Sequence, residues 1–337
     1  MNNYNCLDLN VVKEKISEFA FIEEAKYEIL NEVVDFNPLI IKKKAIETNE
    51  ALNLIRKDFN LSFDGIENIN SILDKADKGI CLSGQELIKV LILHNNCSRI
   101  KKQFNSIDAE LNIKDYIDTL KLDYETFNEI EKCLDLNGDV KDDASDKLRS
   151  INSELLKIDK DLYNRAHQFI DKHTDSLQEN TVYERNNRVC FLIKNSDKNK
   201  YNGFNYGTSA SNLASYVEPE IFIELNNTKL NLIQDKEDEI IRILTNLSYK
   251  VSNCSNYYRY NFDSIKKLCI VFSKAYYGFK NNGIIPSFSN DNYFEFKDLC
   301  HPLIDVNKVV SNSYRLFNPY KGIVISGSNT GGKTVSM

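Results

Sequence analysis

The chain has 337 residues, of which 42% are hydrophobic and 27% charged, and its net charge is −6. This length allows two or three domains, and the composition is ordinary for a globular protein. The acidic balance argues against a surface that coats nucleic acid non-specifically, but it is compatible with a local basic site. No stretch approaches the roughly 18 consecutive apolar residues of a membrane span, and the N-terminus shows no apolar signal-peptide core. We therefore expect a cytoplasmic protein with no membrane partner.

The 8 cysteines are scattered, with no C-x-x-C pair and no His at zinc spacing. Some are flanked by apolar residues, such as Cys190 between Val189 and Phe191. This pattern favours buried, reduced thiols of a cytosolic protein over a disulfide framework or a metal site.

The first hundred residues have a helical pattern. Apolar residues at 3-4-3 spacing predict a helix from about Pro38 to Lys57. Ser83 and Glu86 stand ahead of an apolar run in the spacing of a capping box. In such a box the Ser83 side chain accepts from the Glu86 amide while the Glu86 carboxylate returns to Ser83, so a helix is predicted to begin here.

The middle of the chain contains a second helical segment, followed by a segment with the pattern of β-strands. Between Leu148 and Phe169 apolar residues follow one heptad seam, interrupted by Arg165, and its short length favours a helical hairpin over an oligomeric coiled coil. Residues 181–193 are rich in β-formers around Asn186-Asn187, which predicts a hairpin with a tight turn.

A polar stretch, 195–215, follows this hairpin. Helical periodicity then returns, with apolar residues on one face and the acidic run 237–239 predicted outside it. The apolar positions of this face are Ile233, Ile240, Leu244, Leu247 and Val251. From Tyr293 onward we expect short strands and loops.

The most specific motif is a phosphate-binding loop near the end of the sequence. It fits G-x-x-x-x-G-K-[ST] without mismatch and consists of Gly327, Ser328, Asn329, Thr330, Gly331, Gly332, Lys333 and Thr334. The apolar run Gly322–Ser326 before it predicts a buried strand. The glycines let backbone N–H groups face the phosphates of ATP, Lys333 would reach the β- and γ-phosphates, and the Thr334 hydroxyl would hold Mg²⁺. The alternative is a Gly-rich turn between a strand and a helix.

An ATPase of this kind also needs an acidic residue at the end of a second strand, and the sequence ends at Met337 before such a strand. A first strand without neighbours also lacks backbone partners. We therefore expect no ATP turnover by residues 1–337 alone. Magnesium-dependent hydrolysis that disappears in Lys333→Ala would contradict this expectation.

Several segments of the sequence, the phosphate loop among them, resemble those of a known family. The run Ile325–Val335 is similar to the T-G-P-N-T-G-G-K-T-V segment of MutS-type ATPases, in the form of the second bacterial paralogue, MutS-two. Cys300–Ile304 is similar to the R-H-P-L-L that precedes the loop in that family. Other matches follow in family order at Arg185–Arg188, Ser209–Ser211, Glu218–Pro219 and Leu225–Asn227. Ser328, Asn187 and Cys300 depart from the family pattern, but none of these departures removes a phosphate ligand.

The resemblance implies a mainly α fold with a small β part. It implies a helical core, or lever, in residues 1–140 and 229–284, with a clamp of helices plus a hairpin inserted at 141–228. Residues 285–337 would begin an α/β phosphate-loop ATPase domain, without its second acidic motif or the family's C-terminal nuclease domain, so no catalytic residue is expected in 1–337.

The resemblance also implies an activity. It implies a homodimer in which ATP binding moves clamps on branched DNA and suppresses recombination, akin to mismatch repair. The same family is also linked to collided ribosomes, so ribosomal RNA is an alternative target. A truncated, non-catalytic helical interaction module is a further alternative.

Two groups of candidate site residues follow. His301 corresponds to a family position near the adenine, although a lone His before Pro is more often structural. The second group is a local excess of positive charge that could meet phosphates, or could form an ordinary solvated hairpin. Its members are Arg185, Arg188, Lys194, Lys198 and Lys200.

Overall fold

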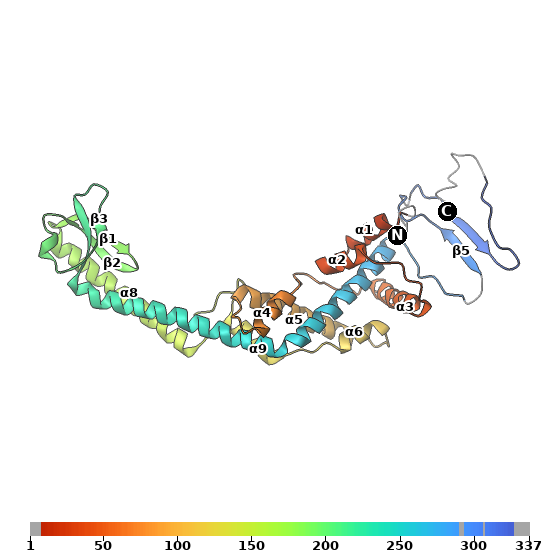
Figure 1. Ribbon diagram of the computed structural model, residues 1–337, viewed down its shortest axis with the longest axis horizontal. Coiled ribbons are helices and arrows are strands. Elements are labelled where there is room, and N and C mark those ends of the chain that lie inside the picture. Colours follow the sequence, from red (N-terminus) through yellow and green to blue (C-terminus); the bar gives the residue numbers. More distant parts are fainter. Residues whose placement is uncertain (1–7, 290–292, 306, 327–337) are drawn as a thin grey trace. The chain divides into compact units, whose positions relative to one another are not determined.

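The computed structural model describes residues 8–289, 293–305 and 307–326 (Figure 1). It is mainly helical with two small antiparallel sheets, which confirms the predicted secondary-structure class. The chain divides into two compact units, one of residues 1–71, 89–123 and 254–337, the other of residues 72–88 and 124–253. The four segments expected from the resemblance remain a prediction. Within the described residues, no helix is both long enough and apolar enough to cross a membrane.

The helices before residue 140 are mostly short. They are α1 (Leu9–Ser17), α2 (Glu23–Leu30), α3 (Pro38–Ile55), α4 (Asn70–Asp77), α5 (Gly84–Asn105), the 3-10 turn η2 (Asn112–Lys114), α6 (Asp115–Asp118) and α7 (Tyr124–Cys133). Helix α3 confirms the predicted helix, and it begins where Pro38 follows Asn37, whose side chain accepts from the Leu39 amide at 3.0 Å.

The capping box at the start of α5 is also confirmed. The Glu86 amide donates to Ser83 Oγ at 3.3 Å, and the Ser83 amide donates to Glu86 Oε2 at 2.9 Å. Both bonds satisfy donors that a helix start would otherwise leave unpaired.

Two long helices follow, α8 (Asp146–His173) and α9 (Glu220–Lys280). In the second unit they run antiparallel: Asp159 of α8 pairs with Lys229 of α9 at 3.0 Å, and Asp142, shortly before α8, pairs with Lys236 at 3.4 Å. Phe169 of the predicted seam meets Phe222 of α9 edge-to-face at 5.7 Å, so this part of the seam packs within the chain.

One helical assignment was wrong. Glu239 was placed outside the apolar face of α9, but it is buried and accepts from Ser145 Oγ at 2.8 Å and from both ends of the Arg242 guanidinium. A buried carboxylate is tolerated here because these donors replace its lost hydration.

The second unit also contains a four-stranded sheet in the order β1-β2-β4-β3. Its strands are β1 (Leu177–Arg185), β2 (Arg188–Lys194), β3 (Gly203–Thr208) and β4 (Ala214–Pro219), and η3 (Lys198–Lys200) lies between β2 and β3. The predicted hairpin is confirmed, because Arg185 pairs with Arg188 around Asn186 and Asn187, whose φ angles are 52° and 59°. The polar stretch 195–215, whose composition gave no strand prediction, contains β3 and the start of β4.

The first unit includes a separate antiparallel pair, β5 (Phe294–Leu299) and β6 (Asn312–Leu316). The buried strand predicted for Gly322–Ser326 is not formed, and Ile323, Val324 and Ile325 are exposed. Among the described residues no strand lies beside this run, and an apolar run without a strand partner leaves its backbone groups to water.

Candidate nucleotide and nucleic-acid sites

The predicted phosphate loop, Gly327–Thr334, lies outside the described residues. The predicted roles of Lys333 toward the phosphates of ATP and of Thr334 toward Mg²⁺ therefore stay predictions. The described chain before the loop, 321–326, has no regular secondary structure.

His301 lies in a local turn shortly after β5. Its Nδ1 accepts from the Leu303 amide at 3.3 Å, and its carbonyl oxygen accepts from the Ile304 amide at 3.2 Å. This turn gives the half-buried imidazole a structural role, and a role toward the nucleotide remains a prediction.

The predicted basic residues lie on or near the four-stranded sheet, whose two faces differ. Side chains alternate between the two faces along β2 and β4, so Phe191, Ile193 and Val217 lie on one face. On that face they form a buried cluster with residues of α8 and α9, such as Phe169 and Phe222. We call the opposite side the outer face. It is defined by Tyr183 and Arg185 of β1, Arg188, Cys190, Leu192 and Lys194 of β2, Tyr216 and Glu218 of β4, and Phe204 and Tyr206 of β3.

Arg188 has a structural partner on the outer face. Its guanidinium donates to both carboxylate oxygens of Glu218, at 2.9 and 3.2 Å, and to Asn227 Oδ1 at 2.5 Å. Glu218 is fully buried, so the ion pair satisfies a charge that would otherwise be expensive to enclose. Tyr206 Oη also donates to this carboxylate, at 2.7 Å.

Asn226 completes this network at the start of α9. Its side-chain amide accepts from the Val189 N–H and donates to the Val189 carbonyl, both at 3.1 Å, as the backbone of a neighbouring strand would. It also donates to Glu218 at 2.8 Å. The network therefore ties α9 to the end of the sheet. Its members Arg188, Glu218, Asn226 and Asn227 all belong to segments that carried the family resemblance.

Arg185 is more exposed than Arg188 and has a different contact. Its guanidinium lies 4.3 Å from the centroid of the Tyr216 ring, a cation–π geometry that leaves its outer side toward solvent. The Tyr216 ring in turn meets the Tyr183 ring edge-to-face at 5.3 Å. Tyr183 donates to Glu179, and this hydrogen bond is the main reason that the pKa of Tyr183 is raised to about 12.

The three lysines lie at the other end of β2 or beyond it. Lys194 Nζ donates to the Asp175 carbonyl at 2.8 Å, and Lys200 pairs with Asp197 at 2.8 Å, which lowers the pKa of Asp197 and raises that of Lys200. Lys198 is exposed in η3. Since β2 spans about 20 Å at the usual rise per residue, the predicted residues form two groups, and Arg185 and Lys198 are the most available cations of each.

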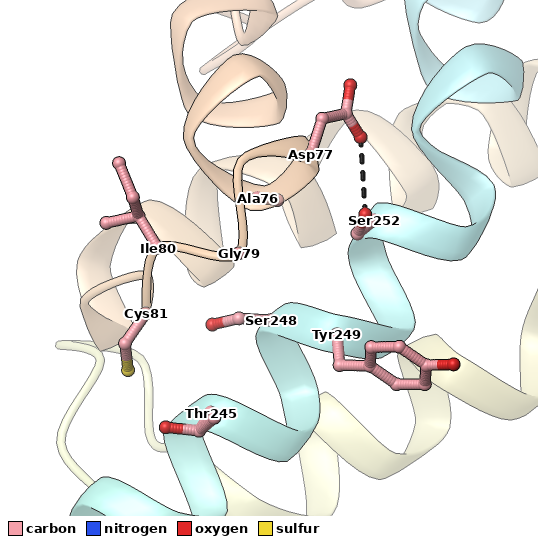
Figure 2. Close-up of a pocket in the computed structure, with 9 residues that line it drawn as sticks. All are labelled: Ala76, Asp77, Gly79, Ile80, Cys81, Thr245, Ser248, Tyr249 and Ser252. Atoms are coloured by element: carbon pink, nitrogen blue, oxygen red, sulfur yellow. Dashed lines mark hydrogen bonds between the residues drawn. The ribbon is translucent and has the colours of Figure 1, made fainter.

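A hollow of about 310 Å³ also lies in the second unit, between the loop after α4 and the facing side of α9 (Figure 2). Its two serines and Asp77 have partners: Ser252 Oγ donates to Asp77 at 3.3 Å, and Ser248 Oγ accepts from the Leu82 amide at 2.8 Å while donating to the Leu244 carbonyl. These contacts hold the loop on α9, and they explain the hollow as part of the packing.

Sequence analysis missed the residues that surround the cations. The buried Glu218 and the aromatic side chains Phe204, Tyr206 and Tyr216 were not singled out as site residues. The alternating pattern of 204, 206, 216 and 218 is the period of a strand and was the available signal, but polar and glycine residues between these positions obscured it.

Comparison with known proteins adds an independent observation. The chain is 32% identical over 343 residues to a protein from Halothermothrix orenii named endonuclease MutS2, in a match that covers 98% of this chain and 43% of that protein. It is 29% identical to an endonuclease MutS2 of Clostridium botulinum, with 98% and 42% covered. A third protein of that name, from Lactobacillus johnsonii, is 27% identical, with 98% and 43% covered. No protein-family model matches the chain.

These similarities extend over almost the whole chain, and they support the resemblance to the MutS-two family. The chain spans less than half of the length of these curated relatives.

Proposed function

We propose that the chain forms the lever and clamp of a MutS2-type protein that acts on DNA under the control of ATP. The observation that carries this proposal is the similarity to proteins named endonuclease MutS2 along 98% of the chain. The phosphate-loop pattern and the residues of the Arg188 network belong to the segments of this sequence that resemble the family. The chain covers less than half of the length of those relatives, so it is a proposal that the chain takes part in their activity.

The nucleotide site would be formed by Gly327–Thr334. Backbone N–H groups and Lys333 would hold the phosphates, and the Thr334 hydroxyl would hold Mg²⁺. The γ-phosphate supplies charge and contacts that a nucleoside diphosphate lacks, which is how such sites bias a conformational equilibrium. In the proposed dimer this bias would open or close the clamps on DNA.

The DNA contact of the clamp would begin with Arg185 and Lys198. These two cations are exposed, whereas Arg188 is committed to the buried Glu218. Affinity that comes from phosphate contacts falls as the salt concentration rises. In a plot of log K against log salt concentration, each neutralised phosphate makes the slope steeper by about 1.

The test is fluorescence anisotropy of the 337-residue chain with a labelled four-way DNA junction and a matched linear duplex over a salt series. We expect tighter binding to the junction, and we expect Lys198→Ala and Arg185→Ala each to lower the salt slope by about 1. Lys160→Ala, an exposed lysine on α8, is the matched control. Calorimetric titration with Mg-ATP, compared with Lys333→Ala, tests the nucleotide site separately.

The same series distinguishes the alternatives. Ribosomes that compete with the junction at lower concentration than unlabelled junction would move the proposal to ribosomal RNA. Absence of any salt-dependent DNA binding, together with equal Mg-ATP titrations for the native chain and Lys333→Ala, would overturn the proposed function in favour of a helical interaction module.

A further inference from the structure

The outer face of the four-stranded sheet carries a group of aromatic side chains that the predicted cationic strip does not explain. They come from three of the four strands: Tyr183 of β1, Tyr216 of β4, and Phe204 and Tyr206 of β3. The helix-facing side is already filled by the apolar cluster of Phe191, Ile193 and Val217 with α8 and α9. These aromatic rings are therefore not required for the core between sheet and helices.

Two of the rings are held in a fixed arrangement. Tyr183 and Tyr216 lie on strands that are not neighbours, yet their centroids are 5.3 Å apart at an interplanar angle of 75°. The small Cys190, paired with Tyr183 on the intervening strand, leaves room for this approach. The hydrogen bond to Glu179 holds the Tyr183 side chain. The Arg185 guanidinium lies over the Tyr216 ring and holds that side chain.

Phe204 extends this surface toward the far edge of the sheet. It pairs with Glu218 of β4, and its side chain is 57% exposed although it is fully apolar. Its neighbour Tyr206 is anchored through its hydroxyl to Glu218 at 2.7 Å. A largely exposed phenylalanine beside anchored tyrosines offers a ring face that solvent contacts unfavourably.

The charges beside these rings differ in exposure and in position. Glu218 is buried and paired with Arg188, whereas Glu179 is an exposed carboxylate that accepts from Tyr183. Arg185 is an exposed cation that lies over the Tyr216 ring, so a phosphate can approach the rings at Arg185. A chain with phosphates on one side and flat apolar bases on the other matches both the cation and the rings.

We propose that this outer face stacks the bases of unpaired DNA, such as the strand exposed at a branch point. The proposal rests on the proposed action of the protein on DNA, and it adds the recognition of unpaired bases. Aromatic residues on the open face of an antiparallel sheet are a general means of binding single strands, because every base has a π-face. Phe204 and Tyr216 contact bases, and Arg185 contacts the adjoining phosphate.

The first test is the affinity for labelled oligo(dT) of about 16 nucleotides, compared with a duplex of equal length. Phe204→Ala should weaken binding of the single strand about 5- to 150-fold, with an unchanged salt slope because no charge is removed. Tyr216→Ala should act similarly, whereas Tyr216→Phe keeps the ring and should bind normally. Tyr163→Ala is the matched control, since Tyr163 is 64% exposed on α8 of the same unit.

The second test uses the absence of tryptophan from the sequence. Phe204→Trp introduces a single tryptophan reporter at the site, and stacking of a base on it should quench its fluorescence on titration with oligo(dT). A Tyr163→Trp chain should show no such quenching. This readout also keeps the test valid if an alanine variant is destabilised.

The outcomes separate this inference from the proposed function. Salt-dependent junction binding with unaltered oligo(dT) affinity in Phe204→Ala would overturn the stacking site while the DNA function stands. Tryptophan fluorescence of the Phe204→Trp chain that stays unquenched at saturation would have the same meaning. Loss of all DNA binding in the native chain would overturn both proposals. Tighter binding to oligo(U) than to oligo(dT) would overturn the assignment to DNA.

Discussion

The four-stranded sheet and the β5–β6 pair are both antiparallel and have strands of similar length, but only the first contains largely buried strands, β2 and β4. In β2 the run from Cys190 to Ile193 is buried, whereas every residue of β5 is exposed. Phe191 of β2 has no exposed surface, and Phe296 of β5 is 44% exposed.

The difference comes from what lies against each sheet. The four-stranded sheet has a layer of helix residues on one face, including Phe169 of α8 and Phe222 of α9. Helix α9 is also bound to the sheet by Asn226 and Asn227. A pair of strands without such a layer is at best marginally stable. Strand composition therefore predicts pairing, but burial requires a second layer.

The largest expected effect tests this contrast with one substitution in each sheet. Phe191→Ala should lower the free energy of unfolding of the second unit by about 3–5 kcal/mol, because it leaves a cavity in the core. Phe296→Ala should cost less than about 1 kcal/mol, because much of that ring is already in water. Hydrogen exchange of the β2 and β5 amides under increasing urea measures both. Equal losses would contradict the comparison.

A smaller effect concerns the start of α8, away from the four-stranded sheet, where Ser145 meets Glu239 of α9. The Arg242 hydrogen bonds, with Ser145 and Lys147 nearby, lower the pKa of the buried Glu239 carboxylate to about 2 despite its burial. Since the folded pKa lies below the unfolded value of about 4.3, the carboxylate stabilises the fold above that pH, and this stability is lost as the pH falls toward about 2.

Glu239→Gln should therefore cost about 1–3 kcal/mol at neutral pH and remove part of the acid sensitivity between about pH 4.3 and about pH 2. Glu295 of β5 is the matched control. Its pKa is lowered chiefly by the Tyr293 hydroxyl, but it lies at the surface, so Glu295→Gln should leave the acid unfolding curve unchanged. Acid unfolding of both variants and the native chain is followed by circular dichroism. A Glu239→Gln curve equal to that of the native chain would refute the stabilising role of the Glu239 carboxylate.

The smallest expected effect is a difference in the labelling of two thiols in the folded protein. Cys190 in β2 is buried, and burial raises its pKa to about 11, whereas Cys300 directly after β5 is exposed. Cys300 should react with a thiol reagent in the folded protein, and Cys190 only after unfolding. Mass spectrometry of peptides after a short labelling pulse distinguishes them. Labelling of Cys190 at the rate of Cys300 would mean that the four-stranded sheet opens readily.

The same contrast separates what was predictable from what was not. The Ser83–Glu86 capping box and the turn at Asn186–Asn187 were predicted correctly, because their hydrogen bonds and backbone angles involve residues at most three positions apart. The strand predicted at Gly322–Ser326 was wrong, because an apolar run specifies a strand only where another strand is available to pair with it.

The sequence by itself thus determined the mainly helical class, the hairpin, the helix starts and the phosphate-loop pattern, all of which depend on local spacing. Only the tertiary structure decided that Glu239 is buried, that Arg188 is structural while Arg185 is exposed, and that four aromatic rings share one sheet face. The partners in these cases are distant in sequence, 94 residues apart for Ser145 and Glu239 and 30 for Arg188 and Glu218. Burial of a charge is set by such partners, and residue type and periodicity do not specify them.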